Sequence, residues 1–196
     1  MEYILTPYQE NRENWAFWEN GFTHEELNWL QQKAKESNQV GYVGYSGPNH
    51  ELLNDIRRSK IDWMKNTSET QWVYTKLAHI VSSLNSMYFG LDITCFGEAF
   101  QLTNYLQEEN GMYGWHQDMA GVGKVSRKLS LVLQLSDPSE YEGGNLQIMI
   151  DKNPVTLKKQ RGLIYAFPSY QLHQVTPVTN GSRQTLVAWA SGPAFK

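Results

Sequence analysis

Apolar residues that alternate with polar ones run through the second half of the chain, and this pattern constrains the fold more strongly than any other feature. In 129–135, four leucines are separated by Ser130, Val132 and Gln134, so one face of an extended strand would be apolar. Turns rich in asparagine, glycine and proline, such as Asn153-Pro154, separate the segments that have this period. The segments expected to be strands are 98–107, 127–136, 145–150, 154–158, 162–167, 171–177 and 183–191. Many short strands at this spacing predict a mainly β fold, either a sandwich or a barrel, and the jelly roll is one member of that set.

The first half of the chain predicts two amphipathic helices instead. Thr23 and Glu26 have the spacing of a capping box, in which each side chain bonds the backbone N–H of the other residue, and a helix over 24–37 is expected. A second capping box over 68–71 precedes an apolar stripe, so 69–88 is expected to be the longest helix. Together these two helices would cover one face of a sheet.

Further stretches are expected to flank these elements. Residues 1–22 are interpreted as an N-terminal strand or loop, and 56–64 as a strand. The glycine- and tyrosine-rich segment 38–50 is either a loop that walls the entrance to a ligand site or an ordinary surface connection. The segment 121–128 is the second candidate wall of that entrance.

Length and composition limit the class of protein. The 196 residues suit one domain, in which about 1–90 would supply helical support and a substrate loop and about 91–196 the β core. A single cysteine, Cys95, allows no internal disulfide, which fits a reducing compartment. The net charge of −3, with its charges scattered, argues against a nucleic-acid partner. No apolar run approaches the ~20 residues of a membrane span, and no secretory signal pattern opens the chain, so a cytoplasmic location is expected.

The strongest candidate for chemistry is the stretch 113–118, which contains His116 and Asp118. Extended backbone points side chains two residues apart to the same side. A third imidazole from a distant strand would complete a 2-His-1-carboxylate face, which leaves positions open on a non-haem Fe(II) ion. The alternative is a structural pair, in which buried histidine and aspartate hydrogen-bond each other without a metal.

The C-terminal half offers a third imidazole, His173, and a cation near it in sequence. Asn180-Gly181 is a hairpin signal, and in an antiparallel pair joined by that turn His173 and Arg183 would lie close together. A guanidinium beside a metal suits a dicarboxylate co-substrate, because the metal can chelate one end while arginine binds the other in bidentate fashion. Thr185 shares a strand face with Arg183 and can add a hydroxyl donor.

In this order and spacing, His116-x-Asp118, His173 and Arg183 resemble the 2-oxoglutarate/Fe(II) dioxygenases of the prolyl-4-hydroxylase-like superfamily. The resemblance covers about 40–192. Its flanking motifs are Tyr105 and Tyr113 before the H-x-D, Gly143-Gly144-Asn145-Leu146, Phe167-Pro168-Ser169 and His173-Gln-Val-Thr-Pro-Val, which is similar to bacterial and phage members. Ile56–Trp63 resembles the strand that follows the substrate-covering loop in oxygen-sensing prolyl hydroxylases.

The resemblance implies a double-stranded β-helix, or jelly roll, supported by two or more N-terminal helices. It also implies Fe(II), 2-oxoglutarate and O₂ as cofactors and co-substrates, with ascorbate as a further cofactor. The implied site residues are His116, Asp118 and His173 as metal ligands, Arg183 on the distal carboxylate of 2-oxoglutarate, and Thr185, Tyr105 and Gln134 as its helpers. Tyr105 lies one residue further from the H-x-D motif than in the family.

Two departures from related enzymes narrow the implied reaction. Asp118 stands where related halogenases have a small residue, so the position for a halide is absent. Trp189 stands where nucleic-acid demethylases have a second arginine, and it would either wall the pocket or pack in the core. The expected reaction is hydroxylation of an amino-acid side chain, first of all prolyl in a peptide or protein, with release of succinate and CO₂. The alternatives are a hydroxylase of a free amino acid or other small molecule, and a non-catalytic cupin-like module that binds a metal or sugar. The setting implied is the cytoplasm of a bacterium or of a phage-infected cell.

Overall fold

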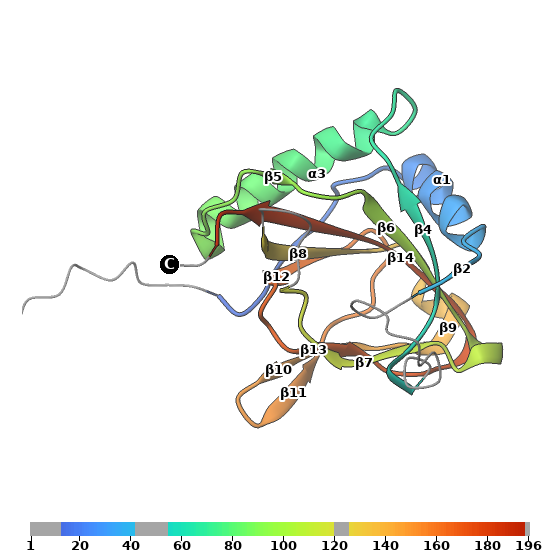
Figure 1. Ribbon diagram of the computed structural model, residues 1–196. Helices are drawn as coiled ribbons and strands as arrows, with labels where there is room; N and C mark the ends of the chain where they lie inside the picture. The colour runs from blue at the N-terminus through green and yellow to red at the C-terminus, as the bar shows by residue number, and fades with distance from the viewer. Residues whose placement is uncertain (1–12, 42–54, 120–125, 195–196) are drawn as a thin grey trace, which may run out of the picture.

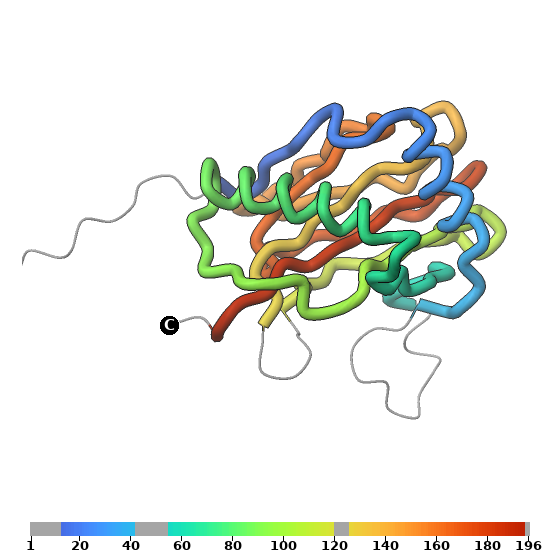
Figure 2. The backbone as a smooth tube through the Cα atoms, turned by 90° about the horizontal axis from the view of Figure 1, so that it is seen from above, coloured from blue at the N-terminus to red at the C-terminus, as the bar shows by residue number. Residues whose placement is uncertain are grey.

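The computed structural model describes residues 13–41, 55–119 and 126–194. They form two antiparallel sheets that pack face to face, with helices across the outer side of the larger sheet (Figures 1 and 2). The mainly β architecture with helical support that the sequence predicts is confirmed. None of the helices in these ranges is long and apolar enough to cross a membrane.

Within the described ranges, the larger sheet has nine strands and the smaller sheet has five. The larger sheet runs in the order β1 (Ala16–Trp18), β12 (Ile164–Pro168), β8 (Ser126–Gln134), β14 (Val178–Gly192), β6 (Phe100–Leu106), β4 (Lys60–Met64) and β2 (Gln39–Val40), while β5 (Cys95–Phe96) and β9 (Tyr141–Gly143) also pair with β14. The smaller sheet runs in the order β11 (Asn153–Thr156), β10 (Leu146–Ile150), β13 (His173–Val175), β7 (Met112–His116) and β3 (Arg57–Arg58). Strands that lie before residue 91 therefore join both sheets.

Two helices cover the larger sheet. Helix α1 spans His24–Lys35, and its capping box is confirmed, since the Thr23 hydroxyl accepts from the Glu26 N–H and the Glu26 carboxylate accepts from the Thr23 N–H. Helix α3 spans Gln71–Leu84 and continues as a π-helical turn over Asn85–Phe89. The second expected capping box is wrong, because α3 begins at Gln71 and its N-cap is therefore Thr70 and not Ser68. The Thr70 side chain makes no bond to the first turn of α3, and its hydroxyl donates instead to the Lys65 carbonyl oxygen at 2.6 Å.

Alternation along β8 gives the larger sheet two different faces. Its leucines at 129, 131 and 133 pack against α1 and α3 in the main apolar core. Val132, between them, packs instead with residues of both sheets, in the interior between the sheets. On the neighbouring strand β14, Leu186 and Ala188 likewise face the helices, so Arg183, Thr185 and Trp189 face the smaller sheet. This polar row between the sheets is where the candidate site is found.

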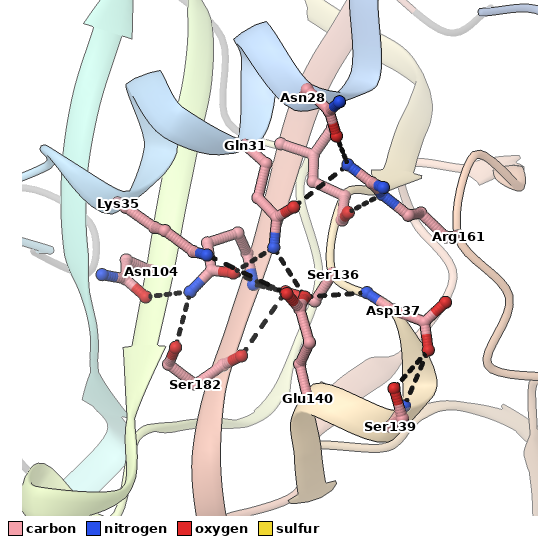
Figure 3. A network of polar contacts seen from close by, with 12 residues as sticks. Asn28, Gln31, Lys35, Asn104, Ser136, Asp137, Ser139, Glu140, Arg161 and Ser182 are labelled. Carbon is pink, nitrogen blue, oxygen red and sulfur yellow. Dashed lines mark hydrogen bonds and ion pairs between the residues drawn. The ribbon is translucent and has the colours of Figure 1, made fainter. Parts of the chain in front are cut away.

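A buried polar network joins α1 to the helix side of β14 (Figure 3). Its centre is Gln184, which is fully buried and has all four side-chain bonds satisfied. The Gln184 amide nitrogen donates to Asn104 at 2.8 Å and to Ser182 at 2.9 Å, and its oxygen accepts from Ser136 at 2.6 Å and from Gln31 at 3.2 Å. Because a satisfied amide is tolerated in a core whereas an unsatisfied one is costly, this network favours the register that turns Gln184 toward α1.

Several local expectations are corrected by the structure. The expected strand over 56–64 is two strands, with β3 in the smaller sheet and β4 in the larger, so the chain crosses between sheets at Ser59. Asn153-Pro154 does not form a turn; it lies in β11, and the turn falls at Asp151 and Lys152. Residues 1–12, most of the 38–50 segment and 120–125 lie outside the described residues.

The expected hairpin at Asn180-Gly181 is also absent. Both residues lie inside β14, where Gly181 pairs with Tyr141 of β9 and has a φ of +68°. A side chain at Gly181 would collide with the carbonyl oxygen of Glu140. Glycine is therefore required here by the close approach of β9 and by the left-handed φ, and the strand continues through it.

Candidate metal centre

Three potential metal ligands converge between the sheets, from two segments that lie far apart in the chain. His116 is the last residue of β7, Asp118 follows it by two residues, and His173 is the first residue of β13. Their ligand atoms all lie within 4.8 Å of one another. The Nε2 atom of His116 lies 3.6 Å from Oδ1 of Asp118, and that of His173 lies 3.6 Å from Oδ2. The convergence that the sequence predicts is present.

Backbone carbonyl groups orient both imidazole rings. Nδ1 of His116 bonds the carbonyl oxygen of Gly114 at 2.8 Å, and Nδ1 of His173 bonds that of Gln171 at 2.9 Å. Because a carbonyl can only accept, each Nδ1 carries the proton and each Nε2 has a free lone pair. Metal-binding histidines in proteins have this arrangement, with one ring nitrogen on the metal and the other donating to the protein.

Ring contacts further restrict the two imidazoles. The Tyr113 ring stacks on His116 with centroids 3.4 Å apart and planes 11° apart. The Arg57 guanidinium covers Tyr113 at 4.6 Å from the ring centroid. On the other side of the pair, Phe167 packs against His173 at a centroid distance of 4.6 Å. These contacts leave each imidazole little freedom to turn away from the common centre.

The Asp118 carboxylate is buried and held by neighbouring groups. Its backbone N–H donates to the Ser169 carbonyl oxygen at 2.8 Å. Its Oδ2 atom accepts two hydrogen bonds, from Ser130 Oγ at 2.8 Å and from Trp189 Nε1 at 2.9 Å. The sequence did not single out Ser130, although its place on the inner face of β8 could have suggested a role. The sequence left two roles open for Trp189, as a wall of the pocket or as a core residue. In the structure its indole N–H donates to Asp118.

The protonation states suit a divalent metal. Burial, together with the nearby His173, lowers the pKa of His116 to about 3. Burial by itself would raise the pKa of Asp118, but the two imidazoles and the two donors outweigh it and lower that pKa below its usual range. At neutral pH His116 is therefore uncharged and Asp118 is ionised, which are the forms that bind metals. Two imidazole nitrogens and one carboxylate oxygen are a donor set that fits non-haem Fe(II).

A second polar group, Arg183, reaches the same interior from β14. It is 1% exposed, and its Nη2 donates to Gln134 Oε1 at 3.1 Å. Its guanidinium carbon lies 5.4 Å from the Tyr105 ring centroid. Within the described part of the chain Arg183 forms no ion pair with a carboxylate, and its Nε is buried without a hydrogen-bond partner. Since buried guanidinium donors are normally satisfied, this group fits one end of an anionic ligand such as 2-oxoglutarate.

The surroundings of Arg183 also fit such a ligand. Thr185 lies opposite Gln134 of β8 and Thr103 of β6, so its side chain is on the same face as Arg183. A side chain at Gly144 would come within 3.0 Å of the Arg183 Cδ atom, so this glycine leaves room for the arginine. His173 and Arg183 thus approach the interior from different sheets, and not from the two arms of a hairpin as the sequence predicted.

Comparison with known proteins agrees with this geometry. Residues 100–191 match the model of the 2OG-Fe(II) oxygenase superfamily. The chain is 43% identical over 110 residues to a PKHD-type hydroxylase of Prochlorococcus marinus, a match that covers 56% of this chain and 48% of the relative. It is 42% identical over 86 residues to a PKHD-type hydroxylase of Nitrosomonas europaea, covering 41% and 38% of the two chains. The chain thus spans about half or less of these relatives.

Solved structures share the fold. A prolyl-4-hydroxylase of Pseudomonas putida superposes with a TM-score of 0.69 at 19% identity, over 90% of this chain and 92% of the other. A Trichoplax adhaerens prolyl hydroxylase, solved with a hypoxia inducible factor peptide fragment, gives a TM-score of 0.73 at 16% identity, over 90% and 83%. A viral collagen prolyl hydroxylase of Paramecium Bursaria Chlorella virus-1 gives 0.66 at 17% identity, over 92% and 97%.

Proposed function

We propose that this chain, whose residues 100–191 match the model of the 2OG-Fe(II) oxygenase superfamily, is a 2-oxoglutarate- and Fe(II)-dependent dioxygenase that hydroxylates an amino-acid side chain. One observation carries the proposal above all others. Two imidazoles and a carboxylate meet at one point, and a buried arginine with an unused donor faces the same interior. A structural His–Asp pair would not require that arginine.

The geometry supports a role for each residue in this proposal. His116, Asp118 and His173 would hold Fe(II), whose chemistry when bound is the activation of O₂ for insertion into a C–H bond. Arg183 would bind the far carboxylate of 2-oxoglutarate, and Thr185 would add a hydroxyl donor. Gln134 accepts a hydrogen bond from Nη2 of Arg183, and the Tyr105 ring packs against the Arg183 guanidinium. The two packed sheets keep bulk water away from these groups, which strengthens every polar contact among them.

As the substrate we propose a prolyl residue in a peptide or protein, with succinate and CO₂ as co-products. The support is the fold shared with prolyl hydroxylases, one of them solved with a peptide, and the similarity to PKHD-type hydroxylases. Ascorbate as a further cofactor, a single domain over 1–196 and a cytoplasmic setting without nucleic-acid or membrane partners belong to the same proposal.

The test of the reaction uses the full chain with Fe(II), 2-oxoglutarate and O₂. We expect succinate to form, faster when a proline-containing peptide library is added, and one peptide class to gain the mass of one oxygen atom. Ascorbate is expected to increase the number of turnovers before inactivation. A free-amino-acid panel run in parallel checks the small-molecule alternative, since hydroxylation of free proline alone would contradict the peptide assignment.

The second candidate is a cupin-like module that binds a metal without turnover. The same assay separates the two classes. A protein that binds one metal ion through His173 and never consumes 2-oxoglutarate under any substrate would be such a module. The unsatisfied Nε of Arg183 favours the enzyme, because a module without a dicarboxylate ligand has no need of a buried guanidinium with an unused donor.

A further inference from the structure

The Asp118 carboxylate has two oxygens in unequal surroundings. Oδ2 accepts two hydrogen bonds, from the Ser130 hydroxyl and from the Trp189 indole N–H. Among the described residues, no donor reaches Oδ1, which lies 3.6 Å from Nε2 of His116. Oδ2 in turn lies 3.6 Å from Nε2 of His173. Both oxygens therefore face an imidazole of the candidate centre, but only Oδ2 is also engaged by hydrogen-bond donors of the protein.

The two donors are built into the sheet as a pair. Ser130 on β8 lies directly opposite Trp189 on β14, so both project from the same face toward Asp118. The Ser130 hydroxyl is fixed in turn by Ser169, whose Oγ lies 3.0 Å away. Because both donors sit on central strands of the larger sheet, neither can move independently of the fold.

Two further side chains pack against the Trp189 indole ring. The Arg127 guanidinium carbon lies 3.7 Å from the ring centroid, and Trp63 packs nearby at a centroid distance of 6.2 Å. Arg127 is in turn fixed by the Glu98 carboxylate, which accepts from its Nε at 2.6 Å and its Nη2 at 2.5 Å. This packing directs the indole N–H at Asp118.

We propose that Ser130 and Trp189 are positioning residues, which engage Oδ2 of Asp118 and leave Oδ1 as the only carboxylate atom for the metal. The inference rests on the proposed function in so far as that function assigns the metal site. A carboxylate bound through one oxygen occupies one coordination position, whereas a bidentate carboxylate occupies two. The pair would thereby keep open a position that a co-substrate or O₂ needs.

The test replaces each donor and measures metal binding without turnover. Trp189→Phe keeps an aromatic ring beneath Arg127 and removes the N–H, and Ser130→Ala removes the hydroxyl with little change of volume. We expect each variant to bind Mn(II) roughly 10-fold to 100-fold more weakly in calorimetric titration. We also expect the visible absorption spectrum of the Co(II)-loaded variants to change, because it reports coordination number and geometry.

Trp63→Phe is the matched control, since it removes an indole N–H from the same stack without touching Asp118. It is expected to keep the wild-type Mn(II) affinity and Co(II) spectrum. Wild-type values in both Trp189→Phe and Ser130→Ala would overturn the inference while leaving the dioxygenase proposal intact. Should Trp189→Phe fail to fold, Ser130→Ala alone decides. Wild-type protein that binds metal but shows no 2-oxoglutarate turnover would remove the enzyme proposal and leave the positioning role standing.

Discussion

His116 and His173 lie directly opposite each other on the adjacent strands β7 and β13, with ring centroids 4.1 Å apart. The backbone pairing of these strands therefore sets the distance between the two imidazoles. Carbonyl bonds at both Nδ1 atoms then turn the Nε2 lone pairs toward Asp118. A centre assembled by strand register, rather than by a flexible loop, is preformed before any metal arrives.

Removing one imidazole tests the assignment of the metal ligands. His173→Ala is expected to abolish stoichiometric Mn(II) binding and Fe(II)-dependent succinate formation, while the far-ultraviolet circular dichroism stays that of the wild type. The reason is that two remaining ligands hold a divalent ion far less well than three. His79→Ala, on the exposed side of α3, is the control and should retain both properties. Full activity in His173→Ala would refute the ligand assignment.

Arg183 is expected to matter for the co-substrate and not for the metal. Arg183→Ala should weaken 2-oxoglutarate binding by on the order of 2–4 kcal/mol, because a charge-assisted bidentate contact is lost. Mn(II) affinity should change little, since Arg183 contacts none of the three ligands. Titration of Mn(II)-loaded protein with 2-oxoglutarate measures the effect, and Arg161→Ala, an arginine on the helix side of the sheet, is the control. An unchanged affinity in Arg183→Ala would place the carboxylate clamp elsewhere.

The stack of Tyr113 on His116 leads to a prediction about ring orientation. Tyr113→Phe keeps the stacked ring and should leave Mn(II) affinity within about 0.5 kcal/mol of wild type, whereas Tyr113→Leu should lose about 0.5–1.5 kcal/mol of it. Burial raises the pKa of Tyr113 to about 12, so its hydroxyl stays protonated in ordinary buffers and supplies no charge to the centre. Equal affinities in Tyr113→Phe and Tyr113→Leu would show that stacking does not orient His116.

The low pKa of His116 predicts how the metal-free protein responds to acid. In the unfolded chain this histidine takes up a proton near its ordinary pKa of about 6.5, whereas in the folded protein it does so only near pH 3. Between these values the unfolded state binds more protons, so the free energy of unfolding falls as the pH falls from about 6.5 toward 3. Urea denaturation in the presence of a chelator, at pH 7 and pH 5, measures this loss.

The matched variants separate His116 from the other groups. His116→Gln should show a smaller loss of stability between pH 7 and pH 5 than the wild type, because the residue that gains the proton is gone. His24→Gln, which changes an exposed histidine at the start of α1, should show the full wild-type loss. If the free energy of unfolding fell by the same amount between pH 7 and pH 5 in all three proteins, His116 would not be the group that titrates.

The polar network around Gln184 predicts a stability effect on the other face of β14. Gln184→Leu leaves Ser136, Asn104 and Gln31 without a bond that each makes in the buried cluster, so the free energy of unfolding should fall by about 1–3 kcal/mol or more. Urea denaturation measures the change. Gln32→Leu, one residue from Gln31 but exposed on α1, should stay within about 0.5 kcal/mol of wild type.

Much of the site could be read from local pattern. The H-x-D spacing put His116 and Asp118 on one side, and the period of two put Arg183 and Thr185 on one face, because side-chain direction in a strand depends only on position along it. The fold class followed from the same alternation. The position of Trp189 in the row with Arg183 was also visible, but nothing local indicated that its N–H meets Asp118.

Two of the expectations that were wrong show how a local signal is overridden by other contacts. Asn180-Gly181 has the composition of a hairpin, yet the approach of β9 holds Gly181 inside a continuous strand. The capping box expected at 68–71 is absent because α3 begins at Gln71, and the Thr70 hydroxyl bonds the Lys65 carbonyl oxygen instead of the first turn. At Gly181 a contact with a strand from another part of the chain overrode the local turn preference. At Thr70 a neighbouring carbonyl group took the place of a helix cap, which is worth only about 1 kcal/mol.

The linear order of polar and apolar residues thus already specified which side chains share a face, and hence which could act together. It left open which strands meet, because strand pairing depends on packing between segments far apart in the chain. Folding alone brought β13 beside β7, so that His173 faces His116, and set Ser130 opposite Trp189 beneath Asp118. The chemistry expected of the residues came from their identity and spacing, and their convergence came from the long-range register of the two sheets.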